Sequence, residues 1–407
     1  MGNALPSPVP SSSPNTAAPV DPPIPVPDVA GSDATPWGLP KRRDLSRRQR
    51  LIVDSSALAD LGLRTMIASI VGAAMLPKVA SAALRPADSL AEREALQFYA
   101  DLGAAHDPAV SFPAPTDLPR VSSRPANPVA EWTAHGRVHN IKFKSSFEAI
   151  NPAVREHRRG YQRNNVVHAQ HWVHDDGPHP TLCLIHGFMG SAYLFNGLFF
   201  SLPWFYRSGY DVLLYTLPFH GKRAERHSPY SGYGYFADGF AEAMAQAVHD
   251  FRSVLDYLEH TGVDRIALTG MSLGGYTSAL IAGVDDRVQA VIPNVPVVTP
   301  ESAFDDWFPA NLLVKLGNRI TRTDRELSTA AAMFHSPLNY APLVPKDRRL
   351  IITGLGDRLA PPEQAELLWR HWDRCAFHWF PGNHILHVSQ PDYLRRMTRF
   401  MAGFMFS

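Results

Sequence analysis

Residues 264–280 read DRIALTGMSLGGYTSAL and contain the pattern that decides the fold. The apolar run that starts at Ile266 predicts a buried strand, and the residues after Gly274 predict a helix. Ser272 lies between them, with a glycine two positions before it and another two positions after it. This spacing fits the sharp strand-to-helix turn that exposes a reactive serine hydroxyl. Ser272 is therefore a candidate nucleophile.

From about Trp132 onward, strand-like and helix-like segments alternate, which predicts an α/β fold with a mostly parallel central sheet and helices on both faces. A helical stripe runs from Phe236 to Leu258, and a final helix carries apolar residues from Tyr393 to Phe404. Residues 299–343 interrupt the alternation, so we expect a helical cap there that selects the substrate. Further strands are expected at residues 166–173, 181–185, 211–217, 288–298, 349–354 and 375–380.

A serine hydroxyl needs a base to activate it, and the base needs a group that orients it. Asp357 lies in GLGDRLAPP and His384 lies in PGNHI, and each follows a predicted strand. The chain order nucleophile, acid, histidine then places Ser272, Asp357 and His384 on loops at one edge of the sheet.

Other residues compete for two of these roles. His387 competes with His384 as the base, and Asp305, Asp306 and Asp373 compete with Asp357 as the acid. The two cap aspartates do not follow a predicted strand, and Asp373 lies at a helix end, so all three are interpreted as surface charges.

Backbone N–H groups that stabilise an oxyanion are expected at two places. Leu273 follows the candidate nucleophile at a helix N-terminus, and Phe188 lies in HGFMG after the strand TLCLI. Met189 is the alternative to Phe188. The neighbouring glycines allow the backbone to approach closely.

Five motifs in chain order make the chain resemble the α/β-hydrolase superfamily from about residue 130 to the C-terminus: HGFMG at 186–190, PFHG at 218–221, GMSLGG at 270–275, GLGDRLAPP at 354–362 and PGNHI at 381–385. The resemblance implies that Ser272, Asp357 and His384 form a catalytic triad and that neither a metal nor an organic cofactor is needed. The turn at 218–221 lacks the acidic residue often found there in that family, and the N-terminal extension has no counterpart in the minimal fold.

The leading hypothesis is a serine hydrolase that cleaves a carboxylic ester or related acyl bond through an acyl-enzyme. The same triad also serves a thioesterase, lactonase, amidase, peptidase or acyltransferase. A non-catalytic binding protein of the same fold is the alternative from a different class. Apolar cap residues such as Trp307 and Leu313 favour a small-molecule acyl substrate that is partly apolar.

Composition limits the partners and the cysteine chemistry. The 407 residues carry a formal net charge of +1, from 39 basic and 38 acidic residues, which gives no field that would attract nucleic acid. Cys183 and Cys375 lie in apolar runs and are expected to be packed thiols rather than a disulfide.

Two clusters have an ordinary structural interpretation. His168, His171 and His174 lie on one strand with no metal-binding spacing around them, so no metal site is predicted. The aromatic residues between Phe195 and Tyr206 could line an acyl pocket, but their helical spacing favours the core.

The N-terminal part is expected to differ from the rest of the chain. Residues 1–40 read as a disordered, Pro-rich tail, residues 41–130 as a helical extension, and residues 131–407 as the catalytic domain. Arg47 and Arg48 weakly resemble a twin-arginine export signal, but Asp54, Asp60 and Arg64 interrupt the segment after them. The uninterrupted apolar part is too short to span a membrane. A cytoplasmic protein is the default, while export and peripheral membrane contact through residues 41–84 stay open.

Overall fold

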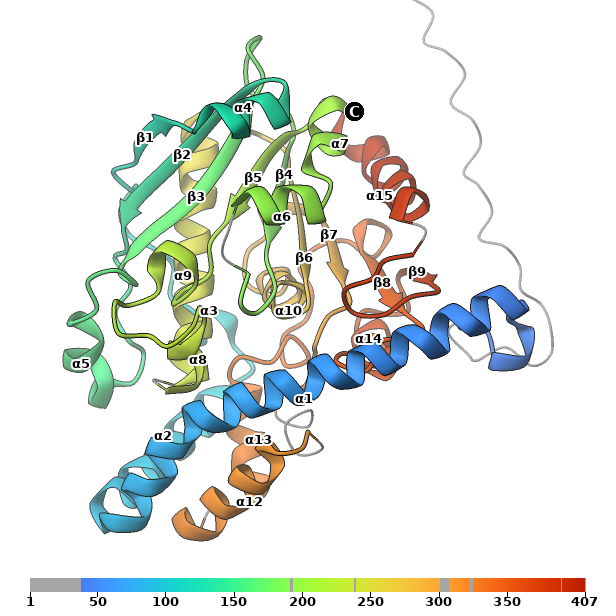
Figure 1. Ribbon diagram of the computed structural model, residues 1–407. Coiled ribbons are helices and arrows are strands. Elements are labelled where there is room, and N and C mark those ends of the chain that lie inside the picture. Colours follow the sequence, from blue (N-terminus) through green and yellow to red (C-terminus); the bar gives the residue numbers. More distant parts are fainter. Residues whose placement is uncertain are drawn as a thin grey trace, which may run out of the picture. The chain divides into compact units, whose positions relative to one another are not determined.

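The computed structural model describes residues 38–190, 193–237, 239–300, 307–322, 325–388 and 390–406 (Figure 1). Most of the expected tail over residues 1–40 lies outside these residues. The chain divides into two compact units, Met1–Asp44 and Leu45–Ser407. All α-helices and strands of the described residues belong to the second unit, so the helical extension and the α/β part form one body.

A single sheet organises this body. Its described strands occur in the order β1-β2-β3-β5-β4-β6-β7-β8-β9. The pairs β1–β2, β2–β3 and β3–β5 are antiparallel, and every pair from β5–β4 to β8–β9 is parallel. The mostly parallel sheet predicted from the sequence is confirmed. The strands are β1 Ser122–Pro125, β2 Arg137–Lys144, β3 Val166–Val173, β4 Thr181–Ile185, β5 Asp211–Tyr215, β6 Ile266–Met271, β7 Val288–Asn294, β8 Leu350–Gly354 and β9 Ala376–Phe380.

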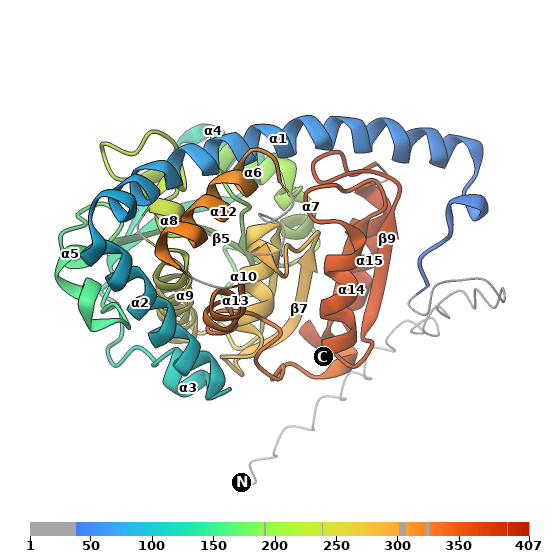
Figure 2. The same ribbon diagram turned by 90° about the horizontal axis from the view of Figure 1, so that it is seen from below.

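Helices cover both faces of the sheet (Figures 1 and 2). The helices considered below are α1 Arg47–Leu84, α2 Pro86–Ala104, α6 Tyr193–Phe199, α7 Leu202–Arg207, α8 Tyr233–Ala237, α9 Phe240–His260, α10 Leu273–Ile281, α12 Ala310–Thr321, α13 Arg325–Met333, α14 Pro362–His371 and α15 Gln390–Met405. Shorter helices are α3 Pro108–Ser111, α4 Pro128–Ala134 and α5 Arg155–Arg159.

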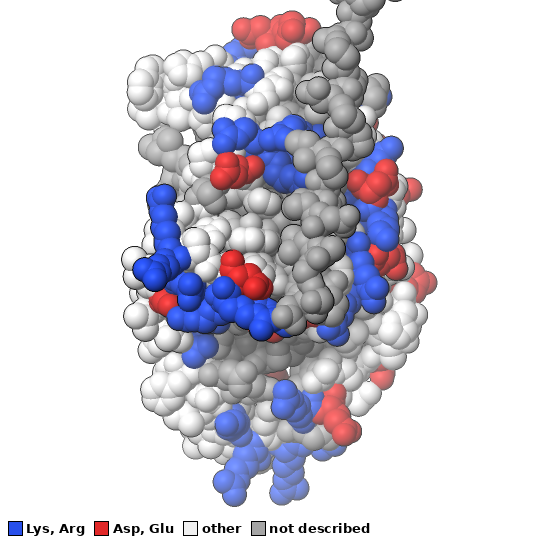
Figure 3. Space-filling model, turned by 90° about the vertical axis from the view of Figure 1, so that its right-hand side faces the viewer, with Lys and Arg blue, Asp and Glu red and all other residues white. Residues whose placement is uncertain are grey.

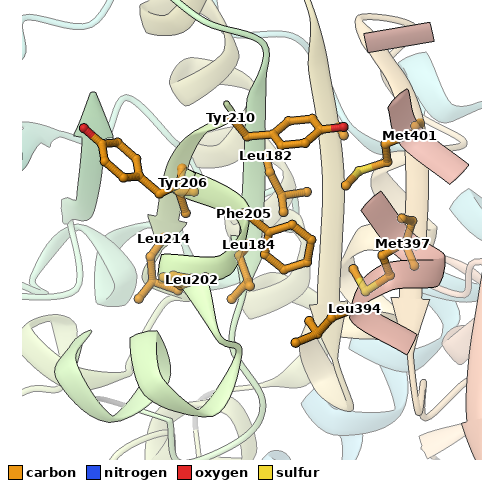
Figure 4. Packing of buried hydrophobic residues seen from close by; sticks show 14 of the residues in the cluster. Leu182, Leu184, Leu202, Phe205, Tyr206, Tyr210, Leu214, Leu394, Met397 and Met401 are labelled. Atoms are coloured by element: carbon orange, nitrogen blue, oxygen red, sulfur yellow. The ribbon is translucent and has the colours of Figure 1, made fainter. Parts of the chain in front are cut away.

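Alternate residues along each strand face opposite sides of the sheet, and both sides are buried in the central strands β4, β5 and β6. On one side, Leu182 and Leu184 of β4 pack with Phe205 of α7 and with Met397 and Met401 of α15 (Figure 4). On the other side, the ring of Tyr215 in β5 meets that of Phe251 in α9, with centroids 5.5 Å apart.

The core interpretation of the aromatic run is confirmed for Phe205 and Tyr206, which are buried in the cluster of Figure 4. Phe199, Phe200 and Trp204 pack against the same cluster while half-buried, and the side chain of Phe195 lies outside the described residues. Cys183 and Cys375 are both buried free thiols, as expected. Burial raises the pKa of Cys375 to about 12, which makes its thiol unreactive.

The strand predictions erred mainly at the C-terminal ends. The strand expected over 211–217 ends at Tyr215, and the one expected over 288–298 ends at Asn294. Both segments continue as buried apolar loop, for example at Leu217 and Val298. The hydrophobic runs there indicate burial rather than strand pairing, because a buried loop can be as apolar as a buried strand.

Helix α1 is the main element that the sequence left undefined. It begins with a capping box, in which Ser46 Oγ accepts the N–H of Gln49 and Gln49 Oε1 accepts the N–H of Ser46. It continues through Pro77 and packs Ala68 and Val71 fully into the protein, whereas Leu58 is 70% exposed. Figures 1 and 2 show it starting beside the loops after β8 and β9 and running past α8 and α12 to α2.

By length and composition α1 is the described helix that could cross a membrane, and 35% of its most apolar segment is buried inside the protein. Its buried alanines and valine show that one face is used for packing on the body.

Surface charge is mixed. Figure 3 shows one face of the molecule, on which Lys and Arg side chains lie next to Asp and Glu side chains. This agrees with the near balance of 39 basic and 38 acidic residues.

Candidate active site

Ser272 occupies a sharp turn between β6 and α10. Its backbone has φ 57° and ψ −117°, a conformation that is costly for a residue with a side chain. The turn is fixed on both sides, because the N–H of Ser272 donates to Asn294 O of β7 at 3.0 Å and its carbonyl accepts from Tyr276 N at 2.9 Å. A side chain at Gly274 would meet the backbone of Ile185 in β4. The strand-turn-helix prediction is confirmed in its geometry.

Asp357 and His384 form a buried pair at the ends of β8 and β9. His384 Nδ1 lies 2.7 Å from Asp357 Oδ2, and the two residues are 0% and 2% exposed, the aspartate being the more enclosed. The other oxygen, Asp357 Oδ1, accepts the backbone N–H groups of Leu359 at 2.9 Å and Ala360 at 2.7 Å. These three hydrogen bonds fix the carboxylate in one orientation and leave Nε2 of the imidazole facing away from it.

The electrostatics of the pair favour a protonated imidazole. Burial alone lowers the pKa of His384, but the charge of Asp357, its hydrogen bond and the charge of Asp60 outweigh burial and raise the pKa above its ordinary value. A histidine in this setting binds a proton more readily than one in water.

Two of the competing residues, His387 and Asp373, have other contacts. His387 directs Nδ1 to Tyr393 Oη at 3.0 Å and Nε2 to the carbonyl of His384 at 3.2 Å, and burial lowers its pKa to about 4. Asp373 has a 72% exposed side chain and lies 3.5 Å from Arg349. Asp305 and Asp306 lie outside the described residues.

The loop after β4, which carries the predicted oxyanion donor Phe188, is held in place by the neutral side chain of His186. His186 Nε2 accepts the N–H of Leu217 at 3.2 Å, so Nδ1 carries the hydrogen and donates it to Gly187 O at 2.8 Å. Gly190 N also donates to Gly187 O. The N–H of a trans peptide points opposite to its carbonyl, so the N–H of Phe188 points away from these donors.

Gly187 lies directly against the candidate nucleophile, since a Cβ added there would be 3.4 Å from Ser272 Cβ. Leu273 is the first residue of α10, so its N–H is one of the helix-terminal donors without an intrahelical acceptor. The two predicted donors therefore lie on the two segments that flank Ser272. Met189 has φ 63°, which places it at the turn of the loop.

The described residues contain no hydrogen bond between Ser272 Oγ and His384. Such contacts are often long in an unliganded site and tighten when substrate binds. The structure thus brings Asp357 and His384 into direct contact and places Ser272 at the end of β6, which β7 separates from β8, at the same edge of the sheet.

Sequence reasoning missed two residues beside this pair, Asp60 and Asn383. Asp60 of α1 accepts the backbone N–H of His384 at 3.1 Å. Asn383 Nδ2 donates to Ser56 O of α1 at 2.8 Å, and Asn383 Oδ1 accepts the N–H groups of Ile385 and Leu386. No local pattern identified Asp60, because it appears in the sequence as a charge that interrupts an apolar run.

Among the described residues, no group of three or more His, Cys, Asp or Glu side chains is arranged to hold a metal ion. His171 of β3 lies 3.3 Å from Tyr257 Oη, whereas His174 contacts Asp211 at 2.8 Å.

Comparisons with known proteins agree with this architecture. Residues 180–319 match the family model described as the alpha/beta hydrolase fold. Two uncharacterized proteins from two strains of Mycobacterium tuberculosis are each 29% identical over 304 residues, which cover 71% of this chain and 68% of the relative.

Among solved structures, an acetyl xylan esterase from a Paenibacillus species has a TM-score of 0.52 at 18% identity and covers 76% of this chain and 93% of its own. Acetyl xylan esterase 1 from a Thermoanaerobacterium species has a TM-score of 0.51 at 15% identity, with 75% and 93% covered. Likeness at this identity concerns the fold. Together with the family model over residues 180–319 and the topology of the sheet, it shows that the chain has the α/β-hydrolase fold.

Proposed function

We propose that the protein is a serine hydrolase that cleaves a carboxylic ester through an acyl-enzyme, with Ser272, His384 and Asp357 as its triad. The observation that carries the proposal is the buried His384–Asp357 pair, 2.7 Å apart, at the same sheet edge as a serine in a strained strand-to-helix turn. Strained backbone clusters at functional sites, because a purely structural turn would gain by relaxing.

In this mechanism Ser272 Oγ attacks the carbonyl carbon while His384 Nε2 takes its proton. The N–H groups of Leu273 and Phe188 donate to the oxyanion. Collapse of the tetrahedral intermediate expels the alcohol, which receives the proton from Nε2. Water then attacks the acyl-enzyme with His384 again as base, and Ser272 leaves with the proton.

We further propose that the substrate is a small molecule with a partly apolar acyl group. Support comes from the cap, where Trp307 and Ala310 pack in one apolar cluster with Leu359, two residues after Asp357. Neighbouring cap side chains Phe308 and Leu312 are 62% and 55% exposed and offer apolar surface to a ligand.

The test combines labelling and turnover. A fluorophosphonate probe is expected to label the wild type and not Ser272→Ala, and Ser272→Ala is expected to lose hydrolysis of p-nitrophenyl acetate. Ser278→Ala is the matched control, since Ser278 lies on the same helix with Oγ bonded to Gly275 O. Unchanged hydrolysis by Ser272→Ala would refute the proposal.

A substrate panel then addresses the chemistry that the triad leaves open. We expect p-nitrophenyl esters of two to eight carbons to be hydrolysed faster than a matched thioester, lactone or anilide. Adding a primary alcohol and measuring the new ester separates hydrolysis from acyl transfer. A flat, background-level profile would contradict an esterase.

Membrane contact through residues 41–84 and a cytoplasmic location remain predictions. Leu51, Leu58 and Leu84 of α1 are at least 70% exposed and form the surface that such contact would use. Co-sedimentation of the full chain with anionic vesicles, compared with the Leu58→Ser variant, measures it.

A further inference from the structure

Helix α1 reaches the loops that carry the acid and the base through one buried carboxylate. Asp60 is 1% exposed, and a single oxygen, Oδ2, accepts the backbone N–H of Arg358 at 2.9 Å and that of His384 at 3.1 Å. Arg358 directly follows Asp357 in the sequence. One atom of the N-terminal helix therefore bridges the backbones on both sides of the His384–Asp357 hydrogen bond.

A second contact between α1 and the loop after β9 lies one helical turn before Asp60. Asn383 Nδ2 donates to Ser56 O at 2.8 Å, and residues four apart lie on one face of a helix. A side chain at Gly356 would meet Ser56 Oγ and Val53 O, so the loop after β8 packs directly against the backbone of α1. The separation of the two catalytic loops thus depends on α1.

Two titratable side chains face Asp60, namely Asp357 from the loop after β8 and His384 from the loop after β9. Burial, together with the nearby charge of Asp357, raises the pKa of Asp60 to about 6, although the two backbone N–H groups and His384 oppose this. The charge of Asp60 in turn helps to raise the pKa of His384.

Resting on the function proposed above, we propose that Asp60 is a positioning residue of the hydrolase. Its carboxylate fixes the spacing between the loops of Asp357 and His384, and its charge stabilises the imidazolium that forms when His384 takes the proton of Ser272. The N-terminal helix then takes part in catalysis through Asp60. The ionised Asp60 carboxylate also lowers the stability of the folded protein at neutral pH.

The test uses full-length Asp60→Asn, with Asp54→Asn as the matched control that removes the same charge from the same helix. We expect Asp60→Asn to lower kcat for p-nitrophenyl acetate by about 10-fold with KM nearly unchanged, because the amide oxygen can still accept the two backbone N–H groups while the charge that stabilises the imidazolium is lost. The acidic limb of the pH profile is expected to move to lower pH, because loss of the negative charge makes His384 easier to deprotonate.

The stability of the folded Asp60→Asn variant is expected to change in the opposite direction to its kcat. The unfolded Asp60 ionises near 3.8 and the folded one near 6, so the wild type loses stability as pH rises between these values and Asp60→Asn does not. The Tm of Asp60→Asn relative to wild type should therefore be higher at about pH 7 than at about pH 4. A residue that merely supports folding would lose activity and stability together.

Wild-type kcat and an unmoved acidic limb in Asp60→Asn would overturn the proposal, as would an equal loss in Asp54→Asn. A fall in kcat that tracks a fall in Tm at every pH would also overturn it. Failure of the proposed function is recognised separately, because Ser272→Ala would then retain the hydrolysis that the Asp60 variants are measured against.

Discussion

Replacing Asp357 by Asn tests the triad through the tautomer of His384. Asp357 Oδ1 accepts two backbone N–H groups, from Leu359 and Ala360, while Oδ2 faces His384 Nδ1. In Asp357→Asn the amide oxygen must take the Oδ1 position, because an NH₂ group there would face two donors. The NH₂ group then faces Nδ1, which has to accept a hydrogen bond, so the hydrogen of the imidazole moves to Nε2.

When the hydrogen of the imidazole is on Nε2, that nitrogen has no lone pair with which to accept the proton of Ser272. In serine proteases the same acid-to-amide change leaves the geometry intact and lowers kcat by about 10⁴, through the wrong tautomer. Since two N–H donors enforce the amide orientation here, we expect a similar loss, equivalent to about 5.4 kcal/mol of transition-state stabilisation.

The assay is steady-state hydrolysis of p-nitrophenyl acetate, with the rate of fluorophosphonate labelling as a second readout. Asp373→Asn is the control, because Asp373 was the competing acid and its side chain is 72% exposed. Asp357→Ala sharpens the test, since it frees His384 to adopt either tautomer and should be more active than Asp357→Asn. It should also be less stable, because two buried N–H groups lose their acceptor at about 1–3 kcal/mol each. Activity of Asp357→Asn equal to or above that of Asp357→Ala would refute the tautomer argument.

Three further outcomes are expected. Ser272→Gly should be inactive yet more stable than Ser272→Ala by about 1 kcal/mol in urea unfolding, because glycine relieves the strained φ of 57° and alanine does not; equal stability would contradict strain at the turn. Arg223→Met should lower the free energy of unfolding by about 3–5 kcal/mol, because the buried Asp250 carboxylate, 2.6 Å from Arg223, then has no counter-charge. The double variant Arg223→Met/Asp250→Leu should recover most of that loss. His387→Gln should retain most of the esterase activity that His384→Gln loses; the reverse ranking would exchange their roles.

Features that are encoded within a short stretch of sequence could be predicted. Ser272, Asp357 and His384 each come after a strand of the sheet, and turn glycines such as Gly274 leave no room for a side chain. Period-two and period-3.6 patterns report which side of an element is buried, so the sheet and α15 could be predicted. These signals depend on residues within a few positions of each other.

Contacts between distant segments gave no such signal. The bonds from Asp60 join residues 298 and 324 positions apart, and nothing in residues 47–84 indicates which surface they cover. Likewise, the strand ends at Tyr215 and Asn294 depend on what the neighbouring strand offers to pair with, and apolar composition does not encode this.

The apolar character of α1 and its charges are explained together by its position. Val53, Ser56, Ala57 and Asp60 are buried and recur at spacings of three and one, as do Ala68, Val71 and Ala74 at spacings of three, so one face of the helix is enclosed. That face changes along its length, from the polar atoms that contact the loops after β8 and β9 to small apolar residues that pack near Trp307 and Ala310. A helix selected only for a bilayer would have no reason to place a carboxylate on its buried face. Asp60, which interrupts the apolar segment in the sequence, is therefore the residue at which the helix meets the loops after β8 and β9.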